Sequence, residues 1–349
     1  MKKRVQRIAL VMMAILLAGC EILPTPGGPA GPATTQPAEQ AIRAYFTAPG
    51  DRKVRDTLES AVLESIDGAQ TQIDVAMYNF SLTSAADALV AAEKRGVEVR
   101  VVLDSDALDG RAVQRLRAGG VQVLGDRRES LMHNKFLVID GRVVWSGSLN
   151  LTESGLSDDN NNFVRIESAG LAKAYADEFD EMFNLDVFGG GAPTAAGAGD
   201  VMVDGTKVEV LFAPDDRPSR RLEELVRQAQ GGIDILAYNF TLNGLRAALV
   251  EAQQRGVRVR AVFDESQADS AGGEYATLEK AGAEVRVDGI DGLMHDKVII
   301  LDGQAVGLGS YNFNRWADEN NDENLLIIHD AGIARAYLAE FERIFAQGK

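Results

Sequence analysis

Two stretches of the chain decide its fold: Met132–Gly141, MHNKFLVIDG, and Met294–Gly303, MHDKVIILDG. Each contains a histidine, a lysine two residues later and an aspartate five residues after the lysine: His133, Lys135 and Asp140, and His295, Lys297 and Asp302. The chain has only three histidines in 349 residues, and two of them begin this pattern. One copy of so short a pattern is usually chance, but two copies at matching places indicate a shared role.

The repeat extends beyond these stretches. Ile73–Phe80, IDVAMYNF, matches Ile233–Phe240, IDILAYNF, and the GSLN of Gly147–Asn150 matches the GSYN of Gly309–Asn312. A period this long indicates two duplicated half-domains rather than a solenoid of short repeats.

Both copies alternate helices and strands in the same order. Apolar strands ending at Tyr78 and Tyr238 are each followed by a helix that stops at a glycine, Gly96 or Gly256. Each His-Lys stretch predicts a strand that turns back as a hairpin, with the Asp-Gly at its tip. The pattern predicts the α/β class, built from two half-domains with mixed sheets.

The doubled motif, with GSxN behind each copy, resembles the phospholipase D superfamily. The resemblance covers residues 51–349. It implies that the halves meet about a pseudo-twofold axis and bring both His-Lys pairs to one site. It also implies phosphodiester cleavage without a metal or other cofactor, and it gives Asp140 and Asp302 a structural role within the motif.

Two facing histidines suit an in-line displacement at phosphorus. One attacks and forms a phosphohistidine, and the other protonates the leaving alcohol. Lys135 and Lys297 would stabilise the charge that grows on the phosphoryl oxygens. The family resemblance adds four phosphate-binding candidates from the two GSxN segments: Ser148, Asn150, Ser310 and Asn312.

The halves differ at one position. The family places an acidic residue between two asparagines to orient a histidine. Glu323 fills this place in the second half, but Asn161 stands there in the first. We expect Asp158 or Asp159 to substitute, or His133 to have a neutral partner. Glu323 would then make His295 the more basic histidine. The family pattern instead favours His133 as the nucleophile, and we assign that role to His133.

The N-terminus predicts export. Four basic residues within positions 2–7 precede the apolar run Ile8–Leu17, and Leu17-Ala18-Gly19-Cys20 resembles a bacterial lipobox. We expect a signal peptide at 1–19, lipidation of Cys20 and location in the cell envelope. A flexible tether at 20–50 would lead to the first half at 51–185, a linker at 186–205 and the second half at 206–349. Cys20 is the only cysteine, so the chain forms no internal disulfide.

The net charge of −16 disfavours long-range attraction of nucleic acid. The leading hypothesis is a monomeric, membrane-anchored phospholipase D acting on phospholipid. An exported nuclease is the alternative, and Arg127 and Arg128 could hold a phosphate backbone. A head-group transferase is the third possibility, and a non-catalytic binding protein is the weakest.

Overall fold

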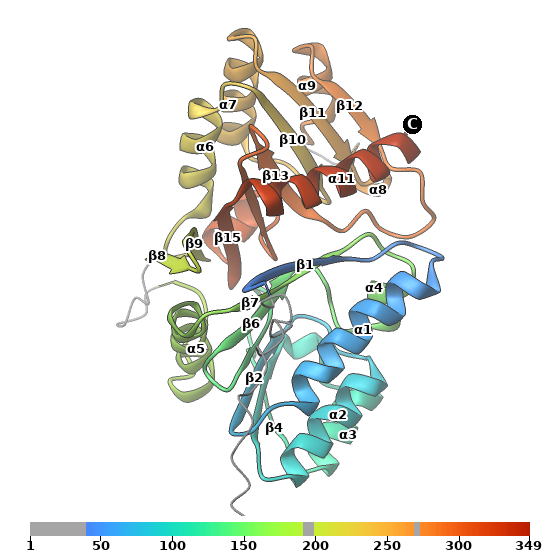
Figure 1. The fold of residues 1–349 in the computed structure, drawn as a ribbon, viewed down its shortest axis with the longest axis vertical. Coiled ribbons are helices and arrows are strands. Elements are labelled where there is room, and N and C mark those ends of the chain that lie inside the picture. Colours follow the sequence, from blue (N-terminus) through green and yellow to red (C-terminus); the bar gives the residue numbers. More distant parts are fainter. Residues whose placement is uncertain (1–39, 191–198, 269–272) are drawn as a thin grey trace, which may run out of the picture. The chain divides into compact units, whose positions relative to one another are not determined.

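The computed structural model describes residues 40–190, 199–268 and 273–349, and Gln40–Lys349 form one compact unit (Figure 1). The predicted signal peptide and Cys20 lie outside the described residues. Two mixed sheets, one from each half of the chain, confirm the predicted α/β fold. Among the described residues, none of the helices combines the length and apolar character needed to cross a bilayer.

The first half forms a seven-stranded sheet in the order β1-β7-β6-β5-β2-β3-β4. Its strands are β1 (Ile42–Phe46), β2 (Gln72–Met77), β3 (Glu98–Leu103), β4 (Gln122–Gly125), β5 (Lys135–Ile139), β6 (Val143–Gly147) and β7 (Asn162–Glu167). Its helices are α1 (Arg52–Asp67), α2 (Thr83–Lys94), α3 (Arg111–Ala118), α4 (Glu153–Ser157) and α5 (Ala169–Asn184), with a 3-10 turn at Ser105–Ala107. The strands β2, β3 and β4 are parallel, and the rest pair antiparallel.

The second half repeats this arrangement with one additional edge strand, in the order β12-β11-β10-β13-β14-β15-β9-β8. Its strands are β8 (Gly199–Val203), β9 (Thr206–Ala213), β10 (Gly232–Ala237), β11 (Arg258–Phe263), β12 (Glu284–Val287), β13 (Lys297–Leu301), β14 (Ala305–Gly309) and β15 (Glu323–His329). Its helices are α6 (Pro218–Gln228), α7 (Asn243–Gln254), α8 (Glu265–Ala268), α9 (Tyr275–Lys280), α10 (Arg315–Glu319) and α11 (Ala331–Gln347).

Helix α1 shows how local sequence sets an element and its packing. The Asp51 carboxylate caps the helix by accepting from the backbone N–H of Lys53 and Val54. Leu58, Val62 and Ile66 recur every four residues, so they share one face and are buried against the sheet. Helices α1, α2 and α3 lie together on the outer face of the first sheet (Figure 1).

A continuous apolar core joins the halves. Its residues come from both sheets and from the helices α5 and α11, including Phe136, Tyr175, Val298 and Tyr337. Separate apolar clusters lie under the outer helices of each half. The shared core holds the two sheets as one body, which fixes the site between them.

Two segments expected to be irregular contain strands. The tether was predicted to reach residue 50, but Ile42–Phe46 form β1, which pairs antiparallel with β7 and buries Ile42 and Tyr45. The linker was predicted to reach residue 205, but Gly199–Val203 form β8 on β9. The partner of β1 is more than a hundred residues away in the sequence, so local patterning did not reveal this strand. β8 and β9 are joined by Asp204-Gly205, a local hairpin signal that the linker prediction did not take into account.

Candidate active site

Each histidine lies on a segment that pairs with the opposite half. The backbone N–H of His133 donates to the carbonyl of Asp322 at 3.0 Å, and that of His295 donates to the carbonyl of Asn160 at 2.9 Å. His133 and His295 therefore sit just before β5 and β13, on short extended segments rather than within the strands. This crossed pairing brings the segment after GSxN of one half against the histidine of the other.

Two buried aspartates hold the residues that directly precede the two histidines. The Asp104 carboxylate, after β3, accepts from the N–H of Met132 at 3.2 Å, and Asp264, after β11, accepts from Met294 at 3.0 Å. Both aspartates belong to the repeat. Because each carboxylate ties a strand end to the residue before a histidine, it sets the depth of that histidine in the site.

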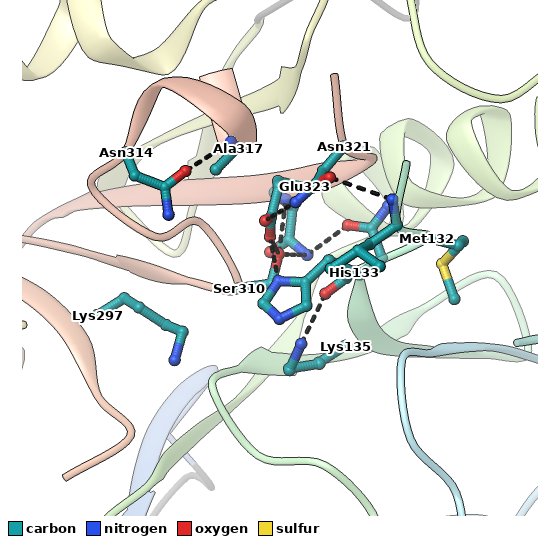
Figure 2. Close-up of polar contacts among 12 residues, drawn as sticks. Met132, His133, Lys135, Lys297, Ser310, Asn314, Ala317, Asn321 and Glu323 are labelled. Carbon is teal, nitrogen blue, oxygen red and sulfur yellow. Dashed lines mark hydrogen bonds and ion pairs between the residues drawn. The ribbon is translucent and has the colours of Figure 1, made fainter. Parts of the chain in front are cut away.

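Glu323 orients His133, the histidine of the other half. Its Oε2 lies 2.8 Å from Nδ1 of His133 and also accepts from the Ser310 hydroxyl at 2.7 Å, while Oε1 accepts from Asn321. Figure 2 shows the His133 ring between Glu323 and Lys135. The expectation that Glu323 would support His295 is wrong, because the post-GSxN segments cross between the halves.

His295 has the neutral partner. Its Nδ1 lies 2.9 Å from Oδ1 of Asn161, which also accepts from the Ser148 hydroxyl at 2.9 Å. The Asn161 amide nitrogen donates to the Gly155 carbonyl at 3.0 Å, so its oxygen must face the histidine. Asp158 and Asp159 do not substitute, since neither contacts a histidine in the described part of the chain. Asp159 instead accepts from the N–H of Leu293.

These partners set the tautomer of both rings. A carboxylate and an amide oxygen are acceptors, so Nδ1 carries the proton in each ring and Nε2 is left for chemistry. Burial lowers the pKa of His133 to about 4, although Glu323 raises it. Burial and the neighbouring lysines lower the pKa of His295 well below its usual value, and a hydrogen bond to the backbone of Ser148 opposes them only in part. The imidazolium is therefore better supported at His133.

The two lysines lie beside the histidines and are fully buried. Each ammonium donates to the carbonyl of its own motif histidine: Lys135 to His133 at 2.7 Å and Lys297 to His295 at 2.5 Å. Burial lowers the pKa of Lys297 to about 7 and that of Lys135 well below its usual value. Each lysine contributes to the lowered pKa of His133, so the site gathers both motifs.

The GSxN residues separate into two roles. The serine hydroxyls donate to the residues that orient the histidines, Ser148 to Asn161 and Ser310 to Glu323. Within the described chain the amide nitrogens of Asn150 and Asn312 donate to no protein group, which leaves them available to a phosphate. Asp140 and Asp302 lie at the far ends of β5 and β13, where they accept from backbone N–H groups at the starts of β2 and β10. They take no part in the site.

A pair of tyrosines completes the site and was not singled out from the sequence. The ring of Tyr78 lies 4.8 Å from that of His133 and 5.0 Å from the Lys135 ammonium. Tyr238 stands at 5.0 Å and 4.8 Å from His295 and Lys297. Tyr78 helps raise the pKa of Tyr238, so the two phenols lie near each other. Their place in the repeated strand ends was the available signal.

Arg127 and Arg128, which could hold a phosphate backbone in the nuclease alternative, both have acidic partners. Arg127 pairs with Asp186, and Arg128 pairs with Asp322 and donates to the Asn320 carbonyl. Apart from the two motif lysines, the charges that act on the tyrosines are acidic: Asp104 and Asp106 at Tyr78, and Asp264 and Asp159 at Tyr238. The surroundings of the site therefore provide no basic surface at these positions for a polyanion.

Comparison with known proteins agrees with this geometry. Residues 62–183 and 222–345 each match the family described as "Cardiolipin synthase, PLD-like domain". The chain belongs to the phospholipase D superfamily. The two matched segments carry one His-Lys motif each, so this member of the family contains both half-sites in a single polypeptide.

Two relatives and one solved structure illustrate the likeness. The chain is 35% identical to a Rickettsia bellii protein named phospholipase D over 133 residues, which are 38% of this chain and 66% of that protein. It is 36% identical to the mitochondrial cardiolipin hydrolase of Xenopus tropicalis over 132 residues, or 38% of this chain and 63% of the relative. The matches thus span just under two thirds of these relatives. The structure of phosphatidylserine synthase from Haemophilus influenzae covers 88% of this chain and 87% of its own, with a TM-score of 0.65 and 17% identity, which shows the fold.

Proposed function

We propose that the protein is a metal-independent phospholipase D that hydrolyses the head-group phosphodiester of glycerophospholipids through a phosphohistidine on His133. The observation that carries the proposal is the pairing of His133 with Glu323 beside His295, Lys135 and Lys297 in one buried site. Membership of the superfamily indicates a phosphodiesterase. The proposal adds that the diester it cleaves is a phospholipid.

The first step is attack on phosphorus. Nε2 of His133 supplies the electron pair for the new P–N bond, while Glu323 stabilises the positive charge that develops on the ring. The P–O bond to the head group breaks, and Nε2 of His295 donates its proton to the departing alcohol. The negative phosphodiester favours the protonated form of His295 and so opposes the burial that lowers its pKa.

The second step releases the phosphatidyl group. His295, now neutral, takes a proton from water, and the resulting oxygen attacks phosphorus as the P–N bond breaks. Lys135 and Lys297 stabilise the phosphoryl oxygens in both steps, because they are fixed in a buried, low-dielectric site. An alcohol in place of water would give head-group transfer through the same phosphohistidine.

The charge around the site supports lipid over nucleic acid. Polyanions bind to grooves with repeated unpaired cations, whereas Arg127 and Arg128 are paired and the groups near Tyr78 and Tyr238 are acidic. Relatives named phospholipase D and mitochondrial cardiolipin hydrolase favour a phospholipid as well.

The deciding experiment supplies competing diesters to the purified chain. Phosphatidylcholine, phosphatidylethanolamine, phosphatidylglycerol and cardiolipin in mixed micelles should each be tested against single-stranded DNA. We expect head-group release from at least one lipid and no DNA cleavage. Cleavage of DNA with all lipids intact would replace this proposal with the exported nuclease, and head-group exchange without net hydrolysis would replace it with the transferase.

We also propose that lipidation of Cys20 anchors the enzyme at the cell envelope. The order of basic residues, apolar run and Leu17-Ala18-Gly19-Cys20 supports it, and acylation with two or more chains gives stable anchoring. Mass spectrometry of the native protein should find an acylated Cys20 as the first residue. An intact Met1 or a free Cys20 thiol would refute the anchor.

A further inference from the structure

In each half-site one side chain contacts Nδ1 of the histidine, and the motif residue after the histidine lies behind it. One of these two side chains is a carboxylate and the other an amide, but the two half-sites place them in opposite order. His133 contacts the carboxylate of Glu323, and behind it the amide of Asn134 accepts from Asn324 at 2.7 Å. His295 contacts the amide of Asn161 instead. In the second half the residue that corresponds to Asn134 is Asp296, which accepts from the amide nitrogen of Asn162 at 2.6 Å. Each half-site therefore has one carboxylate at these two positions. In the first it contacts the histidine ring, and in the second it contacts Asn162 behind the ring.

Asp296 is placed to act on both members of its motif. It is fully buried and lies between His295 and Lys297 in the sequence. Asn162, whose amide donates to Oδ1 of Asp296, also donates from its backbone N–H to the Ser148 hydroxyl oxygen at 3.0 Å. Ser148 uses its one proton to donate to Asn161, the partner of His295. In the described part of the chain the second oxygen of Asp296, Oδ2, has no hydrogen-bond partner.

The charged groups that face Asp296 come from two elements. Lys297 follows it at the start of β13, and Glu340 and Arg343 approach from α11. Burial and Glu340 raise the pKa of Asp296 to about 6, against the opposing effects of Asn162, Lys297 and Arg343. The carboxyl group therefore ionises within the range in which the enzyme is expected to work.

The charges in the site explain why a second carboxylate is needed. Glu323 does most to raise the pKa of both buried lysines, and other carboxylates add to it: Asp104 at Lys135, and Asp296, then Asp264 and Asp159, at Lys297. Buried charges are costly unless an opposite charge lies close by. Asp296 helps to raise the pKa of Lys297, whereas Lys135 has the neutral Asn134 at the corresponding place.

We infer that Asp296 is a positioning residue of the second half-site. Its carboxylate keeps Lys297 charged and, through Asn162 and Ser148, holds Asn161 against His295. The inference rests on the proposed phosphodiesterase site but is independent of which diester is the substrate.

The test uses inorganic phosphate, which needs the lysine charge but no turnover. Calorimetry on the full chain in detergent should compare the wild type with Asp296→Asn between pH 5 and pH 9. Without the carboxylate the Lys297 ammonium is less stable and loses its proton at lower pH. We expect phosphate affinity at pH 8 to fall about tenfold, equivalent to about one unit in the pKa of Lys297. At pH 5 the two proteins should agree, because Asp296 is then protonated.

The alkaline limb of kcat/KM for bis(p-nitrophenyl) phosphate should move to lower pH in the same variant. Asn134→Asp is the matched control: it adds a carboxylate beside Lys135 and should move the limb to higher pH. If Asp296→Asn and the wild type bind phosphate equally at every pH, the charge of Asp296 has no role at Lys297, and the inference is wrong. A uniform loss at pH 5 as well would reduce its role to packing.

Failure of the proposed function has a different signature. If Asp296→Asn binds phosphate more weakly than the wild type at pH 8 but equally at pH 5, while the wild type cleaves no phospholipid, the phospholipase proposal fails and the role of Asp296 stands. A wild type that binds no phosphate at any pH would overturn both.

Discussion

The Glu323 carboxylate, from the second half of the chain, lies 2.8 Å from Nδ1 of His133 in the first half. The contact exists because the segments around Asp322 and Asn160 pair with the opposite histidine segments. Neither half contains a complete support for its own histidine. The repeat therefore encodes one site whose two sides depend on each other.

Replacing Glu323 with Gln should reduce kcat on the order of a hundredfold, because the ring of His133 then loses the carboxylate that stabilises its positive charge in the transition state. Single-turnover kinetics on the best lipid substrate would measure the loss. Glu274→Gln is the control, since Glu274 is also buried but contacts Arg246 rather than a histidine. Near-normal turnover of the Glu323 variant would contradict the assigned role.

Alanine at either motif histidine should nearly abolish turnover by itself. Attack and protonation of the leaving group belong to one displacement, and each contributes on the order of a hundredfold or more. His329→Ala provides the matched control, because the third histidine pairs with Glu209 away from the site. Steady-state rates for His133→Ala, His295→Ala and His329→Ala settle the point, and a nearly normal rate in either motif variant would exclude a shared site.

The sequence predicted the fold and the four central residues because both are repeated. The strand pattern, the Asp-Gly hairpin and the His-Lys pair each occur twice, and the repetition separates them from chance. The partner of each histidine could not be predicted in the same way. Glu323 belongs to one copy, and which histidine it contacts depends on how the halves cross, which local patterns do not encode. Tyr78 and Tyr238 matched in the repeat, but a tyrosine at a strand end has no chemistry specific enough to suggest a role.

Excess EDTA should leave the hydrolysis rate unchanged. The mechanism assigns charge stabilisation to Lys135 and Lys297 and proton transfer to His295, so none of its steps calls for a metal. The assay should compare untreated and chelated enzyme with the same lipid and detergent. Activity that disappears on chelation and returns with added Zn²⁺ or Ca²⁺ would require a different mechanism.

Glu181→Gln should stabilise the protein at alkaline pH. Burial, with Asp215 and Asp322 nearby, raises the pKa of Glu181 to about 7. The folded state therefore holds a proton that the unfolded chain releases near pH 4.5, so stability falls as pH rises between these values. Removing the carboxylate should raise the melting temperature by about 2 °C at pH 8 and leave it unchanged at pH 4. The exposed Glu98→Gln should show no such pH dependence, and an equal effect of Glu181→Gln at both pH values would contradict the cause.

Labelled substrate should leave its phosphoryl group on His133. Both rings have Nδ1 bound, which leaves Nε2 for chemistry, but only His133 has a carboxylate on Nδ1. This partner stabilises the charged ring of a phosphohistidine more than the Asn161 amide can. Rapid quenching without acid, proteolysis and mass spectrometry would locate the label. His295→Ala should accumulate the labelled phosphohistidine when the substrate has a leaving group that needs no protonation, such as p-nitrophenol. The second step is then blocked, since His295 activates its water. Label on His295 would invert the assignment and make Asn161 the partner of the nucleophile. No label on either ring, together with no product of transfer to an added primary alcohol, would replace the covalent step with direct attack by water.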